Sequence, residues 1–174
     1  MDLSEVIRNV PNFPKPGVQF KDISTLVLNP EVFLQVIDVF ANRYAADKPD
    51  AILAVESRGF VFGGALAVRL GVPLIMARKP GKLPADTIRE SFNLEYGTDA
   101  IEIHTGALLP GWRVLILDDL LATGGTVSAA CSLVKRAGGT VQEAAFVIEL
   151  LPLGGREALS PVPVFSQITF HVDE

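Results

Sequence analysis

Four short runs of apolar residues most strongly constrain the fold of this chain. The runs span residues 51–55, 74–77, 114–117 and 144–148. Each lacks the polar alternation of a half-exposed strand, a pattern typical of strands buried on both faces of a parallel sheet. Helical patterns separate the runs, so we predict an α/β fold with a central, mostly parallel β-sheet flanked by helices. In such folds the crossovers are right-handed, and ligands bind at the carboxyl ends of the strands.

Capping residues indicate where the predicted helices begin and end. Asn29 followed by Pro30 predicts an N-cap with proline at the first helical position. Gly71 is predicted to end a second helix, and Gly138 with Gly139 a third. Because no internal repeat, low-complexity tract or linker divides the chain, we expect one domain over residues 1–174.

Composition and charge argue against several classes of protein. The formal net charge of -5 disfavours a large nucleic-acid surface, although small anions can still bind local basic clusters. Cys131 is the only cysteine, so an intramolecular disulfide is excluded and a reducing compartment is expected. The N-terminus lacks the features of a secretory signal, and no apolar run approaches the roughly 20 residues of a membrane helix. We therefore expect a cytoplasmic protein with neither a membrane nor a nucleic-acid partner.

The most informative segment, residues 113–126, predicts a phosphate site. It reads as a buried strand that ends in Asp118 and Asp119 and then turns through Thr-Gly-Gly-Thr into a helix. Backbone amides freed by such a turn can converge on a phosphate, helped by the helix dipole. The residues expected to contribute amides or hydroxyls are Ala122, Thr123, Gly124, Gly125 and Thr126. Just before them, Asp118 and Asp119 can accept hydrogen bonds from two vicinal ribose hydroxyls, so the segment is predicted to bind a ribose 5-phosphate ester.

Two common nucleotide-binding motifs do not match this segment. A Walker A loop requires a lysine after the glycines, and none follows Gly125. The dinucleotide pattern Gly-x-Gly-x-x-Gly is also absent. An ordinary strand-to-helix connection, with solvated acids and Thr126 as a helix cap, remains the simplest alternative.

The order of strand, acid pair and Thr-Gly-Gly-Thr resembles the 5-phosphoribosyl-1-pyrophosphate (PRPP) signature of the type I phosphoribosyltransferases. The variant in this chain is most similar to that of the adenine-specific members. Further similar segments are residues 13–24, 56–60, 78–84, 94–97 and 149–156, so the resemblance covers about residues 13–165. It implies the type I phosphoribosyltransferase fold, with a small N-terminal hood over about residues 1–28, a PRPP-binding core over about 29–165, and a mobile loop.

The implied reaction transfers a 5-phosphoribosyl group from PRPP to N9 of adenine, giving AMP and pyrophosphate in purine salvage. The resemblance also implies a homodimer. Mg²⁺ is the implied cofactor, bound through PRPP rather than by a dedicated set of protein ligands. His104 and His171 are isolated in the sequence and do not suggest a zinc site.

The resemblance also assigns roles to individual residues. Pyrophosphate contacts are expected from Ser57, Arg58, Arg78, Lys79 and Lys82, the last three on the mobile loop. A non-proline cis peptide is implied at Ser57-Arg58. Glu95 resembles the catalytic carboxylate that manages the imidazole protons of the purine. Adenine contacts are expected from the Phe20 ring, from backbone groups around Gln19 and Lys21, and from Leu120 on the opposite face.

Two alternatives to adenine transfer stay open. A 6-oxopurine phosphoribosyltransferase would be expected to place a lysine late in the chain to bind O6, and residues 141–170 contain none. A non-catalytic regulator of the same fold, which senses PRPP or purines, would be expected to add a basic surface or a DNA-binding domain.

Overall fold

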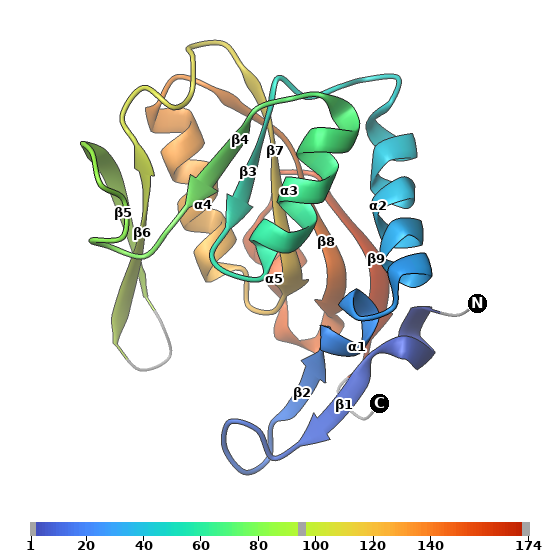
Figure 1. Ribbon diagram of the computed structural model, residues 1–174. Coiled ribbons are helices and arrows are strands. Elements are labelled where there is room, and N and C mark those ends of the chain that lie inside the picture. Colours follow the sequence, from blue (N-terminus) through green and yellow to red (C-terminus); the bar gives the residue numbers. More distant parts are fainter. Residues whose placement is uncertain (1–2, 94–96, 172–174) are drawn as a thin grey trace.

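The computed structural model describes residues 3–93 and 97–171. A five-stranded parallel sheet forms its centre, with strand order β4-β3-β7-β8-β9 (Figure 1). The strands are β3 (Ala51–Val55), β4 (Leu74–Ala77), β7 (Arg113–Leu121), β8 (Thr140–Leu150) and β9 (Val164–Phe170). The predicted α/β class and parallel sheet are therefore confirmed.

Each of the four apolar runs lies within a strand of the sheet. The first two match β3 and β4, and the other two lie inside the longer β7 and β8. The edge strand β9 was not predicted, because its sequence, Val-Phe-Ser-Gln-Ile-Thr-Phe, mixes polar and apolar residues and it is only partly buried.

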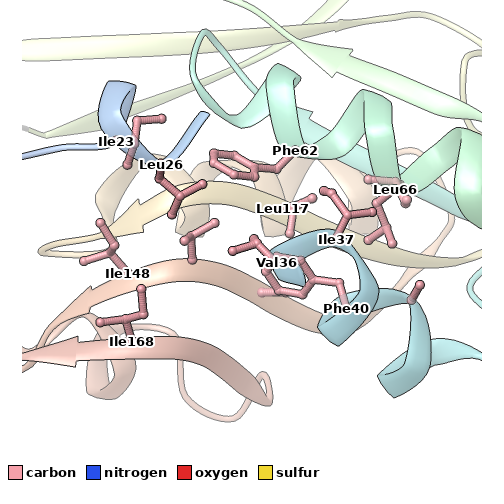
Figure 2. Packing of buried hydrophobic residues seen from close by; sticks show 14 of the residues in the cluster. Ile23, Leu26, Val36, Ile37, Phe40, Phe62, Leu66, Leu117, Ile148 and Ile168 are labelled. Carbon is pink, nitrogen blue, oxygen red and sulfur yellow. The ribbon is translucent and has the colours of Figure 1, made fainter. Parts of the chain in front are cut away.

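Helices cover both faces of the sheet. On one face lie α2 (Pro30–Tyr44) and α3 (Gly59–Leu70), and on the other lies α4 (Gly125–Arg136). Figure 2 shows Phe40 of α2 and Phe62 of α3 packed with Leu117 of the sheet, all three fully buried. The predicted capping is confirmed. The Asn29 side chain accepts hydrogen bonds from two backbone amides at the start of α2, Gly71 caps α3 with φ +66°, and Gly138 follows α4 with φ +87°.

Smaller elements surround the carboxyl ends of the parallel strands. At the N-terminus, η1 (Leu3–Val6) precedes an antiparallel pair, β1 (Arg8–Pro11) and β2 (Gln19–Asp22), and α1 (Ser24–Val27) follows. We call the β1-β2 pair the N-terminal hairpin. It projects beyond the sheet at the end where β7 and β8 finish (Figure 1). The turn after β8 contains η2 (Leu151–Leu153) and α5 (Gly155–Ala158).

A second antiparallel pair, β5 (Thr87–Asn93) and β6 (Thr98–His104), packs beside α4. The gap between these strands contains residues 94–96. Within the described parts of the chain, no helix combines the length and apolarity needed to cross a membrane.

Candidate active site

The candidate site is built from the segments that follow two neighbouring strands, β3 and β7. These strands pair in parallel, with Ala54 opposite Leu117, so their carboxyl ends lie together. Glu56, Ser57 and Arg58 follow β3 and lead into α3, while residues 122–124 connect β7 to α4. This is the edge of an α/β sheet where ligand sites are expected.

A cis peptide is present in the segment after β3, but not at the predicted bond. It joins Glu56 to Ser57, one residue earlier than Ser57-Arg58. The sheet still holds the Glu56 amide, which donates to the Ala77 carbonyl at 2.9 Å. By contrast, the Ser57 carbonyl already accepts from Phe60 at 3.2 Å as the α3 turn begins. The Glu56-Ser57 peptide therefore lies between these two hydrogen bonds, where the chain leaves the sheet.

The two aspartates lie at the end of β7 in different surroundings. Asp119 is 3% exposed, and its Oδ2 is 2.5 Å from Arg58 Nε. Asp118 Oδ1 accepts the Asp119 backbone N-H at 2.8 Å. Desolvation of the Asp118 carboxyl, reinforced by the negative charge of Asp119, raises the pKa of Asp118 well above its ordinary value.

A glycine allows α3 to begin against this acid pair. A Cβ atom at Gly59 would lie 2.9 Å from Asp118 Oδ1 and 3.0 Å from the Leu117 carbonyl. The Gly59 backbone is therefore in close contact with β7, which brings Arg58 within reach of Asp119.

The predicted phosphate-binding residues surround one small cavity. Residues 122–126, which we call the phosphate loop, line a cavity of about 90 Å³ together with Asp118, Leu120, Leu121 and Val127. Gly124 has φ +85° and is the N-cap of α4. Ser128 N-H donates to the Gly124 carbonyl at 2.8 Å, so the amides just before Ser128 lie in the first turn, where they have no intrahelical acceptor. The arrangement suits an anion, because free N-H groups and the positive end of the helix dipole coincide.

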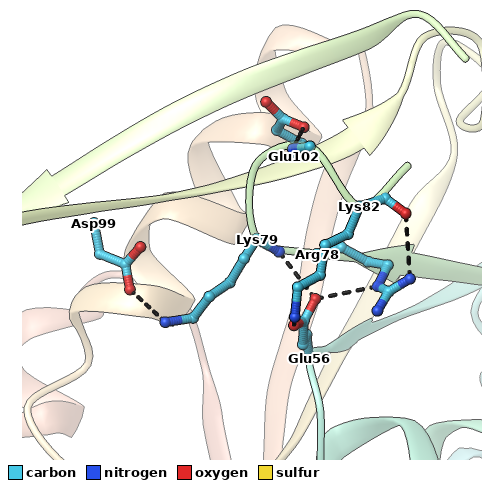
Figure 3. Close-up of polar contacts among 7 residues, drawn as sticks. Glu56, Arg78, Lys79, Lys82, Asp99 and Glu102 are labelled. Atoms are coloured by element: carbon cyan, nitrogen blue, oxygen red, sulfur yellow. Dashed lines mark hydrogen bonds and ion pairs between the residues drawn. The ribbon is translucent and has the colours of Figure 1, made fainter. Parts of the chain in front are cut away.

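The predicted basic contacts gather around Glu56, an acid for which no role was predicted. In the segment of residues 78–84, which we call the basic loop, Lys82 Nζ lies 2.7 Å and Arg78 Nε 3.1 Å from the Glu56 carboxylate (Figure 3). The Lys79 backbone N-H also donates to Glu56, at 3.0 Å. Burial alone would raise the pKa of Glu56, but these hydrogen bonds outweigh it and lower the pKa.

The side chain of Lys79 is held separately, 2.9 Å from Asp99 Oδ2 (Figure 3). Glu56 could have been suspected from its position directly before Ser57 and Arg58. Asp99 carries no such signal, since it belongs to the distant strand β6.

Three of the predicted adenine contacts, Gln19, Phe20 and Lys21, are divided between the two faces of β2, and the fourth, Leu120, lies on β7. The Phe20 ring faces the site, with its centroid 5.4 Å from the Arg58 guanidinium carbon. The neighbouring side chains point to the opposite face, as strand alternation requires. There Gln19 and Lys21 line a different cavity of about 250 Å³, which also includes Leu150 and Phe170. On the Phe20 side of β2, residues 19 and 21 therefore present their backbone rather than their side chains.

Glu95, the predicted catalytic carboxylate, lies outside the described residues. The strand that precedes it does reach the site, because a Cβ atom at Gly125 would lie 3.5 Å from the Phe92 ring and 3.8 Å from the Asn93 carbonyl. Within residues 3–93 and 97–171, no three His, Cys, Asp or Glu side chains are grouped in a way that could hold a metal ion.

Comparisons with known proteins identify the family. Residues 22–173 match the family model of the phosphoribosyl transferase domain. The adenine phosphoribosyltransferase of Chloroflexus aurantiacus is 57% identical over 169 residues, which covers 97% of this chain and 98% of that protein. The crystal structure of the Thermoanaerobacter pseudethanolicus enzyme of that name superimposes with a TM-score of 0.94 at 47% identity, covering 97% of this chain and 98% of the other.

A third comparison carries ligands. Adenine phosphoribosyltransferase from Saccharomyces cerevisiae, solved with adenine and an imino-altritol bisphosphate, matches with a TM-score of 0.90 at 40% identity over 95% of this chain and 96% of its own. The family model, the identities and the near-complete coverage agree. This chain belongs to the phosphoribosyl transferase family and, within it, to the adenine phosphoribosyltransferases.

Proposed function

We propose that this protein transfers the 5-phosphoribosyl group of PRPP to N9 of adenine, forming AMP and releasing pyrophosphate in purine salvage. The observation that carries the proposal is the cavity of the phosphate loop beside Asp118, in a chain that is 57% identical to a named adenine phosphoribosyltransferase over nearly its whole length.

The ribose phosphate half of PRPP occupies the end of β7 in this proposal. Amides of the phosphate loop and the hydroxyls of Thr123 and Thr126 hold the 5′-phosphate. Asp118 and Asp119 accept hydrogen bonds from the ribose hydroxyls.

Pyrophosphate binds next to Arg58 in this proposal. The Ser57 backbone contributes beside it, and the basic loop supplies Arg78, Lys79 and Lys82. Because Glu56 and Asp99 hold these three residues, pyrophosphate competes with carboxylates for them. Closure of the basic loop over the reactants would exclude water from the activated ribose.

The purine is placed between Phe20 and Leu120, with its edge hydrogen-bonded to the backbone of residues 19 and 21. The N-terminal hairpin thereby acts as the hood of the site. As N9 bonds to C1 and the C1-oxygen bond to pyrophosphate breaks, Glu95 accepts or relays the imidazole proton of adenine. This role for Glu95 rests on the family resemblance; the described strand β5 ends at Asn93, whose carbonyl lies near Gly125 of the phosphate loop.

Mg²⁺ is proposed to arrive with PRPP. The donor set fits this mode of binding, because Asp118 and Asp119 are the only carboxylates that we assign to PRPP and they supply too few ligands for a protein-held ion. They can contact an ion through water. When bound, the ion would neutralise charge on the leaving pyrophosphate.

A homodimer in the cytoplasm completes the proposal. The surface formed by α3 and the edge strand β4 exposes Val61, Val68, Leu74 and Met76, with Val68 85% exposed. An apolar surface of this kind favours association of two copies. The free thiol of Cys131 suits a reducing compartment.

Product identification tests the assignment. The protein is incubated with PRPP, Mg²⁺ and one of adenine, hypoxanthine, guanine or xanthine, and the nucleotides are separated by chromatography. We expect AMP from adenine and no product from the other bases. Formation of IMP or GMP would instead favour the 6-oxopurine alternative, and PRPP binding without any nucleotide would favour a regulator.

A further inference from the structure

The turn after β8 lies directly against the phosphate loop. A Cβ atom at Gly155 would be 2.3 Å from the Ala122 carbonyl and 2.8 Å from the Leu121 side chain. The contact is reciprocal, because a Cβ atom at Gly124 would be 3.0 Å from the Gly155 carbonyl. Since real Cβ atoms do not approach other atoms at 2.3 Å, only glycine at position 155 permits this contact between backbones.

The next residue anchors the turn to the sheet. Arg156 donates to the Glu149 carboxylate from Nε at 3.0 Å and from Nη2 at 2.5 Å, and its Nη1 donates to the Val164 carbonyl at 2.8 Å. The Ser166 hydroxyl is hydrogen-bonded to the same carboxylate. Glu149 is 2% exposed and lies opposite Leu121 in the β7-β8 register. The anchor therefore joins α5 to the strands β8 and β9.

We propose that Gly155, Arg156 and Glu149 are positioning residues for the 5′-phosphate of the substrate. None of the three is assigned a substrate contact. The bidentate ion pair holds α5 in place. The Gly155 backbone, in contact with Ala122 and Gly124, then fixes the position of the phosphate loop. The amides of the phosphate loop are thus oriented before the ligand arrives, which lowers the entropy cost of binding.

The inference rests on the proposed function, and it distinguishes the two halves of PRPP. Support from α5 reaches the phosphate loop, whereas the proposed pyrophosphate contacts, Arg58 and the basic loop, are held by Asp119 and Glu56. Loss of this support should therefore weaken the binding of ribose 5-phosphate and leave the binding of pyrophosphate unchanged.

The first test replaces Arg156 by Met, which keeps much of the length of the side chain and removes its charge. We expect the inhibition constant of ribose 5-phosphate and the KM for PRPP to rise by about ten-fold or more, while the inhibition constant of pyrophosphate stays within about two-fold. R156K should recover part of the loss, since it restores the charge without the bidentate geometry.

The matched control is R43M. Arg43 forms the same bidentate pair with Glu143 near the other end of β8, at 2.7 and 2.8 Å. Thermal melting should show that both variants lose stability, but R43M should leave all three constants within about two-fold.

A second pair of variants keeps the proposal testable if R156M does not fold. In G155A the new methyl group displaces the phosphate loop while the ion pair remains. Its control is G139A, where a Cβ atom would also be crowded, 2.8 Å from Leu108. Gly139 lies just before the amino end of β8, at the opposite end of this strand from Gly155. We expect ribose 5-phosphate to bind about ten-fold more weakly to G155A than to G139A.

Equal losses for ribose 5-phosphate and pyrophosphate, or equal effects of R156M and R43M, would overturn the inference. Failure of the wild-type protein to form AMP would instead reject the proposed function, so the two failures are distinguishable.

Discussion

The two ends of β8 carry the same interaction for different purposes. At the amino end, Glu143 pairs with Arg43 and accepts the Tyr44 hydroxyl at 2.6 Å. At the carboxyl end, Glu149 pairs with Arg156 and a serine hydroxyl. The first arginine belongs to the 15-residue helix α2 and also packs on Phe165, with its guanidinium carbon 4.1 Å from the ring centroid. The second belongs to a four-residue helix beneath the phosphate loop.

In both pairs the carboxylate is buried and the arginine is partly exposed, so burial does not explain the difference in role. What each pair does depends on the backbone that its arginine holds. Near Glu143 that backbone is a long, well-packed helix, so the pair serves stability. Near Glu149 it is a short turn in contact with a proposed ligand site, so the pair also serves binding.

The largest expected effect concerns Glu95, the proposed catalytic carboxylate. Replacing Glu95 by Gln should lower kcat by about 10²-fold or more and leave PRPP affinity nearly unchanged, because a proton acceptor is lost but no phosphate contact is. Steady-state kinetics and calorimetry measure the two quantities. E90Q is the control, since Glu90 lies on β5 and pairs with Arg136 on the surface. Unchanged turnover in E95Q would remove Glu95 from the mechanism.

At the amino end of β8, Glu143 should affect stability but not substrate binding. E143Q leaves Arg43 and Tyr44 without a charged partner, so the free energy of unfolding should fall by about 2 kcal/mol. Denaturant unfolding measures this loss. The KM values for adenine and PRPP should stay within about two-fold of the wild-type values. A large rise in either KM would show that the two ends of β8 are coupled.

Asp118 should show the opposite behaviour to Glu143. Because the folded protein raises the pKa of Asp118, its ionised form opposes folding at neutral pH. D118N should therefore raise the free energy of unfolding, by about 1 kcal/mol.

In the D118N/D119N double variant, PRPP should bind about ten-fold more weakly or worse, because charged acceptors for the ribose hydroxyls are lost. Wild-type PRPP affinity in the double variant would contradict the ribose role.

The smallest effect is the dependence of stability on pH. The folded state lowers the pKa of Glu143, because the hydrogen bonds from Arg43 and Tyr44 outweigh the opposing effect of burial. A lowered pKa contributes stability above the unfolded-state value of about 4.3, and that stability is lost as the pH falls through the folded-state pKa. Unfolding curves from about pH 6 to about pH 3 should show the wild-type protein losing about 1 kcal/mol more than E143Q. Parallel curves would show that the Glu143 pair does not contribute.

Part of this molecule could be predicted from local sequence alone. The strands β3 and β4, the helix ends at Asn29, Gly71 and Gly138, and the phosphate loop each depend on residues close together in the chain. Continuous apolarity, capping residues and glycines act through the backbone within a few residues, so their effects can be anticipated from their order.

The partners of the charged residues were decided only by the tertiary structure. Arg58 and Asp119 are 61 positions apart in the sequence, and Arg43 and Glu143 are 100 apart. Glu56, which follows β3, binds Arg78 and Lys82 of the basic loop, which follows the neighbouring strand β4. The position of the cis peptide and the existence of the edge strand β9 could not be predicted from the local sequence either. Such pairings depend on which strands become neighbours, and strand order results from packing the whole core rather than from any one segment.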